Sequence, residues 1–122
     1  MEQTKRVLCI EDERFIGELD RRSLEKAGYT VDIVTDGQSG LAAVLTDQYD
    51  FVLLDIMIPQ ILGIDILHTV RQQKPDLKAK IVITTNLEQG EESRKEIEQE
   101  ADGYLIKAEI TPSELVEFLS QL

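Results

Sequence analysis

Cysteine, tryptophan, positive charge and long apolar runs are all scarce in this sequence of 122 residues. The single cysteine, Cys9, cannot form a disulfide within the chain, so we expect a cytoplasmic protein in which Cys9 is a small core residue. Basic residues number 13 against 24 acidic residues, which gives a formal net charge of -11. Nucleic acids and anionic membranes both require a positive surface, so this balance argues against them and favours a cationic partner or a metal ion.

No stretch of the sequence has the length and apolarity of a transmembrane helix. Near the N-terminus, Lys5 and Arg6 are followed by only four apolar residues before the acidic residues begin, so we expect no signal peptide. The length is typical of one domain and sufficient for one hydrophobic core. We therefore expect a single domain over residues 1–122.

Short apolar runs alternate with segments of helical periodicity along the whole chain. We expect strands at 7–10, 30–34, 51–55, 81–85 and 103–107, and helices at 14–27, 41–45, 64–74, 88–100 and 111–122. Runs without polar interruption are typical of parallel strands that are covered on both faces. The alternation therefore predicts a parallel sheet with helices on both faces, and Asp32, which interrupts the second run, indicates a strand at the edge.

The last helix has the clearest start signal in the chain. Thr111 and Glu114 have capping-box spacing, with Pro112 at the first helical position. We expect an apolar stripe on this helix, made by Leu115, Phe118, Leu119 and Leu122.

The other helices have weaker signals. Asp36-Gly37 is typical of a turn before the second helix. The segment 88–100 contains few apolar residues besides Ile97, so its helix should be mostly solvated and lightly attached to the body. We expect the first helix to bury an apolar stripe made by Phe15, Ile16, Leu19, Leu24 and Ala27.

Polar side chains lie at the carboxyl ends of four of the five predicted strands. Glu11 and Asp12 follow the first strand, and Asp55, Thr85 and Lys107 end the third, fourth and fifth strands. Because the carboxyl ends of parallel strands lie at the same edge of a sheet, these side chains can converge. Singly, each has a simpler explanation: a turn cap for Asp55, charges at a helix N-terminus for Glu11 and Asp12, a strand threonine and a surface lysine. Their repeated placement at strand ends favours one joint site.

Three carboxylates at close range repel one another and raise one another's pKa unless a cation joins them. Magnesium fits this role, since proteins usually hold it by one or two carboxylates together with water and a phosphate oxygen. With the ammonium of Lys107 and the hydroxyl of Thr85 nearby, the charge on a transferring phosphoryl group would be neutralised on two sides. We therefore predict that Asp55 forms an acyl phosphate.

In combination these motifs resemble the receiver domain of two-component response regulators, the CheY-like domains, over essentially the whole chain. The resemblance is carried by Glu11-Asp12 after VLCI, Asp55 in LLDIMIP, Gly63 in the following loop, Thr85 in IVITTN, and Tyr104 and Lys107 in GYLIK. The motifs are individually weak, but their order and spacing together are specific. The resemblance implies an α/β, flavodoxin-like fold of five strand–helix units, with a parallel sheet in the order 2-1-3-4-5.

The resemblance also implies roles for the residues at the strand ends. Asp55 would receive a phosphoryl group from the phosphohistidine of a sensor histidine kinase or a phosphotransfer protein. Asp12 and Asp55 would ligate Mg2+ directly, Glu11 would act through water, and Met57 would contribute its backbone carbonyl. Lys107 would pair with the phosphoryl group.

Further implications concern the output. Thr85 would move toward the phosphoryl group and Tyr104 would turn inward, which would change the face formed by the fourth helix, the fifth strand and the fifth helix. The protein would be a phosphorelay switch for an unknown downstream protein, as a monomer or a phosphorylation-dependent dimer, with no direct contact to nucleic acid or membrane. It would catalyse only its own phosphorylation and dephosphorylation. A strand aromatic is the simpler explanation of Tyr104.

Several residues depart from the family pattern. Ala108 stands where the family commonly has a proline in a cis peptide, so this loop should differ, and Asn86 replaces the usual small residue. The two positions that tune loss of the phosphoryl group are Met57 and Leu87. Neither can orient an attacking water, so we predict slow decay of the phosphoryl group.

Other functions remain open on the sequence. A pseudo-receiver would only bind partners, and a phosphotransferase of the haloacid dehalogenase type would need a second aspartate where Met57 stands. A flavin-binding flavodoxin is disfavoured because Glu11 to Glu13 occupy the position of a phosphate-cradling loop. The sequence ends with the last predicted helix, so we expect no output domain, and it leaves open whether the chain stands alone or was cut from a longer regulator.

Overall fold

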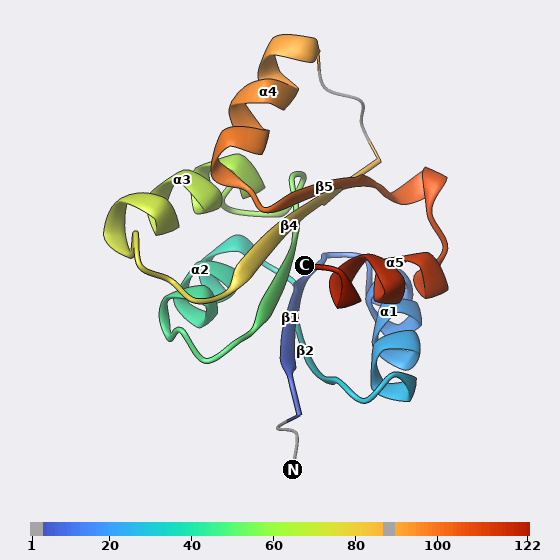
Figure 1. Ribbon diagram of the computed structural model, residues 1–122. Coiled ribbons are helices and arrows are strands. Elements are labelled where there is room, and N and C mark those ends of the chain that lie inside the picture. The colour runs from blue at the N-terminus through green and yellow to red at the C-terminus, as the bar shows by residue number, and fades with distance from the viewer. Residues whose placement is uncertain (1–3, 87–89) are drawn as a thin grey trace.

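The computed structural model describes residues 4–86 and 90–122, and over these residues it shows one five-stranded sheet flanked by helices (Figure 1). The strands are β1 (Arg6–Ile10), β2 (Thr30–Val34), β3 (Phe51–Asp55), β4 (Lys80–Thr85) and β5 (Gly103–Ile106). The helices are α1 (Arg14–Lys26), α2 (Gly37–Leu45), α3 (Gly63–Gln73), α4 (Glu91–Glu100) and α5 (Pro112–Ser120), with a 3-10 helix η1 (Lys107–Glu109) after β5. All neighbouring strands are parallel and their order is β2-β1-β3-β4-β5. The predicted flavodoxin-like fold is thereby confirmed, and β2 lies at an edge as predicted.

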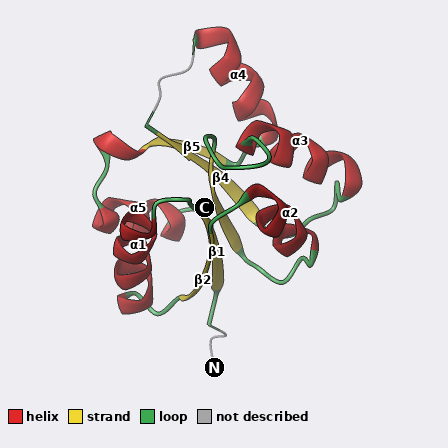
Figure 2. Ribbon diagram, turned by 180° about the vertical axis from the view of Figure 1, so that it is seen from behind, coloured by secondary structure: helices red, strands yellow, loops and turns green. Residues whose placement is uncertain are grey.

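Helices cover both faces of the sheet, with α1 and α5 on one face and α2, α3 and α4 on the other (Figures 1 and 2). Side chains alternate along a strand, so neighbours in sequence enter different core clusters. In the central strand β3, Val52 and Leu54 pack against the α2–α3–α4 layer, whereas Phe51 and Leu53 pack against the α1–α5 layer. Each such burial contributes roughly 1.5–3 kcal/mol, which explains why β3 is apolar up to Asp55.

The start of α5 follows its sequence signal. The amide of Glu114 donates to Thr111 Oγ1 at 3.1 Å, and the amide of Thr111 donates to Glu114 Oε1 at 2.9 Å. Pro112 occupies the first turn, where a missing N–H costs no helical hydrogen bond. Because α5 ends at Ser120, the prediction that Leu122 belongs to its buried stripe is wrong, and this residue is exposed.

The second helix begins earlier than predicted, at Gly37. Asp36 caps it, since the amide of Ser39 donates to Asp36 Oδ1 at 2.8 Å. A Cβ atom at Gly37 would lie 2.8 Å from the backbone of Ile61, so the helix N-terminus packs directly on the loop after β3. The Asp-Gly pair is therefore a helix start in this chain.

The buried face of α1 also differs from the prediction. Phe15 is 76% exposed, Leu19 is also exposed, and Ala27 is exposed just after the helix ends. Instead, Asp20 shares the face of Ile16 and Leu24, which lie four residues before and after it, and is partly buried. A carboxylate thus occupies a position on the helix face that packs toward the sheet.

Helix α4 is the least embedded helix. Ile97 is the one fully buried side chain among those described on α4, which confirms the predicted solvated helix. Residues 88–89, at the start of the predicted segment, lie outside the described residues. Within residues 4–86 and 90–122, no helix has both the length and the apolarity needed to cross a bilayer.

Candidate functional site

The carboxyl ends of β1, β3, β4 and β5 meet at one edge of the sheet. Strand pairing aligns Ile10 with Leu54 on β1 and β3, and Thr85 with Ile106 on β4 and β5. The polar residues that end or follow these strands are therefore neighbours in space, although they are far apart in sequence.

Three of these residues form an acid cluster, defined as Glu11, Asp12 and Asp55. Each has a carboxylate oxygen within 4.8 Å of the other two. Glu11 and Asp55 are buried, at 3% and 5% exposure, whereas Asp12 is exposed. Backbone amides help to orient the buried pair: Glu13 N–H donates to Glu11 Oε2 at 3.2 Å, and Met57 N–H donates to Asp55 Oδ1 at 3.1 Å.

The ammonium of Lys107 bridges the two buried carboxylates. Its Nζ donates to Asp55 Oδ2 at 2.9 Å and also to Glu11 Oε1. Burial lowers the pKa of this lysine, but the hydrogen bonds and charges of Asp55 and Glu11 outweigh burial and raise the pKa overall. Lys107 is therefore a fixed positive charge within the acid cluster.

The chain around Lys107 departs from the predicted strand. This residue begins η1, so β5 ends at Ile106. The described peptide bonds are all trans, including the one between Lys107 and Ala108. The connection from β5 to α5 thus turns through a short 3-10 helix.

The acid cluster has the electrostatics of a site for a divalent cation. Burial raises the pKa of Glu11 to about 7, even though the hydrogen bond from Lys107 opposes this shift. If all three carboxylates ionise, they exceed the one ammonium by two negative charges. Hard carboxylate oxygens at this spacing are the ligands that Mg2+ prefers, so the donor set fits the predicted ion.

Thr85 and Tyr104 lie close to this edge on neighbouring strands. Thr85 is completely buried and Tyr104 is 9% exposed. Because Ile83 pairs with Tyr104 and side chains alternate along β4, Thr85 and Tyr104 share one face of the sheet. On that face, the guanidinium carbon of Arg94 on α4 lies 4.5 Å from the centroid of the Tyr104 ring. The strand-end threonine and the tyrosine thus lie on the face of the sheet that α4 covers.

The other residues singled out in the sequence differ in how far they are exposed to solvent. Met57 follows the acid cluster with an exposed side chain, and Asn86 is exposed after β4. Leu87 lies outside the described residues. Cys9 is buried, as expected for a core residue, and burial raises the pKa of its thiol, so it is not a reactive nucleophile.

One titratable group near the site was missed by the sequence reasoning. Burial raises the pKa of Asp20 to about 6, against a smaller opposite effect of Lys107. Its spacing of four residues from both Ile16 and Leu24 was the signal that placed this aspartate on the buried face of α1.

The fold and the site define an α/β protein of the flavodoxin-like class, with a cluster of three carboxylates at its strand ends that could hold a metal ion. Comparison with known families agrees: the chain belongs to the response regulator receiver domain family, which it matches over residues 7–120. Domains of this family are phosphoacceptor signalling switches of two-component systems, and they bind Mg2+ at an acidic pocket.

The chain is also similar to part of several curated transcriptional regulators. The chain is 37% identical over 117 residues to the transcriptional regulatory protein DltR of Streptococcus agalactiae, covering 96% of this chain and 50% of DltR. It is 35% identical over 102 residues to the transcriptional regulatory protein CusR of Escherichia coli, covering 84% of this chain and 44% of CusR. The chain therefore spans about half the length of these relatives.

Solved structures show the same domain. A CheY-like receiver domain protein from Methanospirillum hungatei superimposes with a TM-score of 0.85 at 27% identity, covering 98% of this chain and 93% of the other. The response regulator TrrA from Thermotoga maritima, solved in complex with Mg(2+)-BeF, superimposes with a TM-score of 0.82 at 32% identity. The match covers 97% of this chain and 98% of TrrA.

Proposed function

We propose that Asp55 is the residue that accepts the phosphoryl group in this receiver domain. The observation that carries the proposal is a buried carboxylate in an acid cluster with the Lys107 ammonium 2.9 Å away. The donor would be the phosphohistidine of a sensor histidine kinase or a phosphotransfer protein. A carboxylate oxygen of Asp55 bonds to phosphorus while the bond from phosphorus to the histidine nitrogen breaks, which leaves an acyl phosphate.

The acid cluster would hold a magnesium ion. Asp12 and Asp55 would provide direct carboxylate ligands, with Glu11 acting through water and Met57 through its backbone carbonyl; the proximity of the three carboxylates supports this assignment. When bound, Mg2+ neutralises charge that develops on the transferring oxygens. The structure of TrrA, solved in complex with Mg(2+)-BeF, supports this assignment by similarity.

Lys107 would change partners during the reaction. Before transfer, its ammonium is shared between Glu11 and Asp55. A phosphoryl group on Asp55 offers additional charged acceptor oxygens, which form stronger charge-assisted hydrogen bonds. The ammonium then pairs with these oxygens.

The signal would pass through Thr85 and Tyr104. The hydroxyl of Thr85 would move toward a phosphoryl oxygen and donate to it, and the ring of Tyr104, already only 9% exposed, would turn further inward. The contact of Arg94 with the Tyr104 ring couples this position to α4, which is anchored by Ile97. The readout would therefore be the surface of α4, β5 and α5.

The phosphoryl group would decay slowly. The exposed thioether of Met57 cannot activate water, and Leu87 offers no polar group for that purpose either. A half-life of only seconds in the purified protein would contradict this expectation.

Partners follow from the same function. The domain would act in the cytoplasm on an unknown downstream protein, as a monomer or as a phosphorylation-dependent dimer. It would not itself bind nucleic acid or membrane, given its net charge of -11. It would catalyse only its own phosphorylation and dephosphorylation. A pseudo-receiver that only binds partners is the second candidate, favoured by Ala108 and Asn86 at positions where the family has other residues.

Phosphorylation can be tested with a small phosphodonor. After incubation with Mg2+ and acetyl phosphate, intact mass should show one added phosphoryl group on the native protein and none on Asp55→Asn. Asp32→Asn, which removes an exposed carboxylate in the middle of the edge strand β2, should be labelled like the native protein. Absence of any label in the native protein would favour the pseudo-receiver, and turnover of added phosphate esters would indicate a phosphotransferase.

A further inference from the structure

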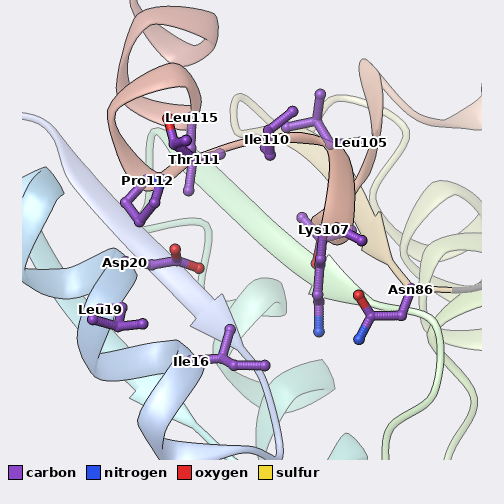
Figure 3. Close-up of a pocket in the computed structure, with 12 residues that line it drawn as sticks. Ile16, Leu19, Asp20, Asn86, Leu105, Lys107, Ile110, Thr111, Pro112 and Leu115 are labelled. Atoms are coloured by element: carbon purple, nitrogen blue, oxygen red, sulfur yellow. The ribbon is translucent and has the colours of Figure 1, made fainter.

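A cavity of about 230 Å3 lies between α1 and the connection from β5 to α5 (Figure 3). Its walls are mainly apolar and include Ile16, Leu19, Leu105, Ile110, Pro112 and Leu115. Pockets for drug-sized ligands usually measure about 300–1,000 Å3, so this cavity suits a more compact group.

One carboxylate interrupts the apolar lining. Asp20 projects from α1 into the cavity (Figure 3), and among the described residues it makes no hydrogen bond or ion pair. Burial raises its pKa to about 6, so it is ionised at neutral pH but poorly solvated. A charge in this position is only partly hydrated and has no hydrogen-bond or ion-pair partner among the described residues. A ligand with a hydrogen-bond donor and a positive charge would supply the partner.

The nearest cation in the protein is committed elsewhere. Lys107 lines the same cavity, but its ammonium bonds to Glu11 and Asp55. Asn86 also lines the cavity, and its amide oxygen is a second acceptor for a ligand with several N–H groups. The polar groups of the cavity therefore match a donor-rich cation better than an anion.

We propose that this cavity binds a compact organic cation, an ammonium or guanidinium group on a short apolar stem, with Asp20 as its counter-ion. The apolar walls receive the stem, and the carboxylate accepts charge-assisted hydrogen bonds from the cationic head. The net charge of -11 raises the local concentration of such cations around the protein. A free amine and the lysine or arginine side chain of a partner protein share this chemistry. Phosphorylation of Asp55 plays no part in the assignment, so the two proposals fail independently.

Titration with n-butylammonium chloride, followed by NMR of labelled protein, tests the site. We expect saturable amide shifts on α1 and from η1 to the start of α5, with affinity at least about tenfold weaker in Asp20→Asn. The control variant Asp76→Asn loses an exposed carboxylate and the same charge, and should bind within about twofold of the native protein. n-Butanol has the same size without the charge and should bind at least about tenfold more weakly than the ammonium.

A second probe identifies the source of the cation. If Nα-acetyl-lysine N-methylamide shifts the same amides with similar affinity, the cavity admits the side chain of a partner protein. If only n-butylammonium does so, the ligand is a free amine, and both results support the cation site. Equal binding of n-butanol, unchanged affinity in Asp20→Asn, or no saturable shifts in these elements would overturn the proposal.

Discussion

The two ends of the sheet carry similar pairs of charged side chains in different surroundings. At the amino end of β1, Arg6 pairs with Asp32, in the middle of the edge strand β2, at 3.4 Å, and these side chains are 42% and 56% exposed. At the carboxyl end, Lys107 pairs with Asp55 at 2.9 Å, and these side chains are 15% and 8% exposed. Water screens the first pair, so its net contribution to stability is small. The second pair is desolvated, so removal of one partner leaves the other charge without compensation.

The comparison distinguishes a carboxylate whose charge is satisfied by water and protein groups from a carboxylate whose charge is not. The carboxylate of Asp32 is also bonded by the Tyr49 hydroxyl at 2.7 Å and needs no ligand. Glu11, in contrast, has its pKa raised to about 7 by burial, although Lys107 and a backbone amide both bond to it. A buried carboxylate whose negative charge is not fully offset by nearby protein groups marks a candidate ligand site.

The largest difference should appear when each basic side chain is replaced by methionine. Lys107→Met leaves Glu11 and Asp55 without a counter-charge and should lower the free energy of unfolding by about 2–3 kcal/mol near pH 8 without Mg2+. Arg6→Met should lower it by at most about 1 kcal/mol. Urea unfolding of both variants measures this contrast, and equal losses would show that burial does not distinguish the two ends.

Binding of Mg2+ should also distinguish the two pairs, but by increasing the stability of the folded protein. An ion that binds only the folded protein stabilises it by about 2.7 kcal/mol at 100 times its dissociation constant. We therefore expect a rise in the melting temperature that EDTA reverses, a much smaller rise in Asp12→Asn, and an unchanged rise in Asp32→Asn. If Asp12→Asn responded to Mg2+ like the native protein, the ion would bind outside the acid cluster.

The sequence was sufficient to predict features that depend on local pattern. Apolar runs located the strands, and the Thr111 box located the start of α5, because both signals are complete within a few residues. The convergence of Glu11, Asp55 and Lys107 at one edge followed from the parallel order of the strands. Which carboxylates the lysine would contact could not be predicted, since this depends on the turn of η1 after β5.

Tertiary contacts explain the errors in the helices. Gly37 begins a helix because its backbone packs on Ile61, a contact between segments that are distant in sequence. The prediction for Phe15 was wrong, and Asp20 was missed, for a related reason. Residue type favours burial of the phenylalanine, whereas helix phase places the aspartate on the inner face. Helix phase proved the better guide to burial on α1.

Asp20 should give the next largest effect, with a sign opposite to that of Lys107. The pKa of this carboxyl rises from 3.8 to about 6 in the folded protein, because burial disfavours its charged form. Asp20→Asn removes this cost and should increase the free energy of unfolding by about 1–2 kcal/mol near pH 7, after allowance for the water that still reaches the side chain.

The pH dependence of this gain provides its control. Near pH 4, most of the gain should vanish, because the carboxyl is largely protonated in the folded state and pays little for burial. As pH rises from about 4 to about 6, the unfolded chain releases the proton first, so the native protein loses stability relative to Asp20→Asn across this window. A gain of the same size near pH 4 and pH 7 would contradict the assigned cause.

The smallest effect should be the coupling between Arg6 and Asp32. A double-mutant cycle of Arg6→Met and Asp32→Asn, measured by urea unfolding, should give a coupling free energy of about 0–1 kcal/mol that decreases as salt is added. The guanidinium carbon of Arg6 lies 4.8 Å from the centroid of the Tyr49 ring, and this cation–π contact should survive in Asp32→Asn. Part of the contribution of Arg6 to stability is therefore independent of the ion pair. A salt-insensitive coupling of several kcal/mol would mean that the amino end is shielded from water like the carboxyl end, and exposure would then not explain why only one end forms a site.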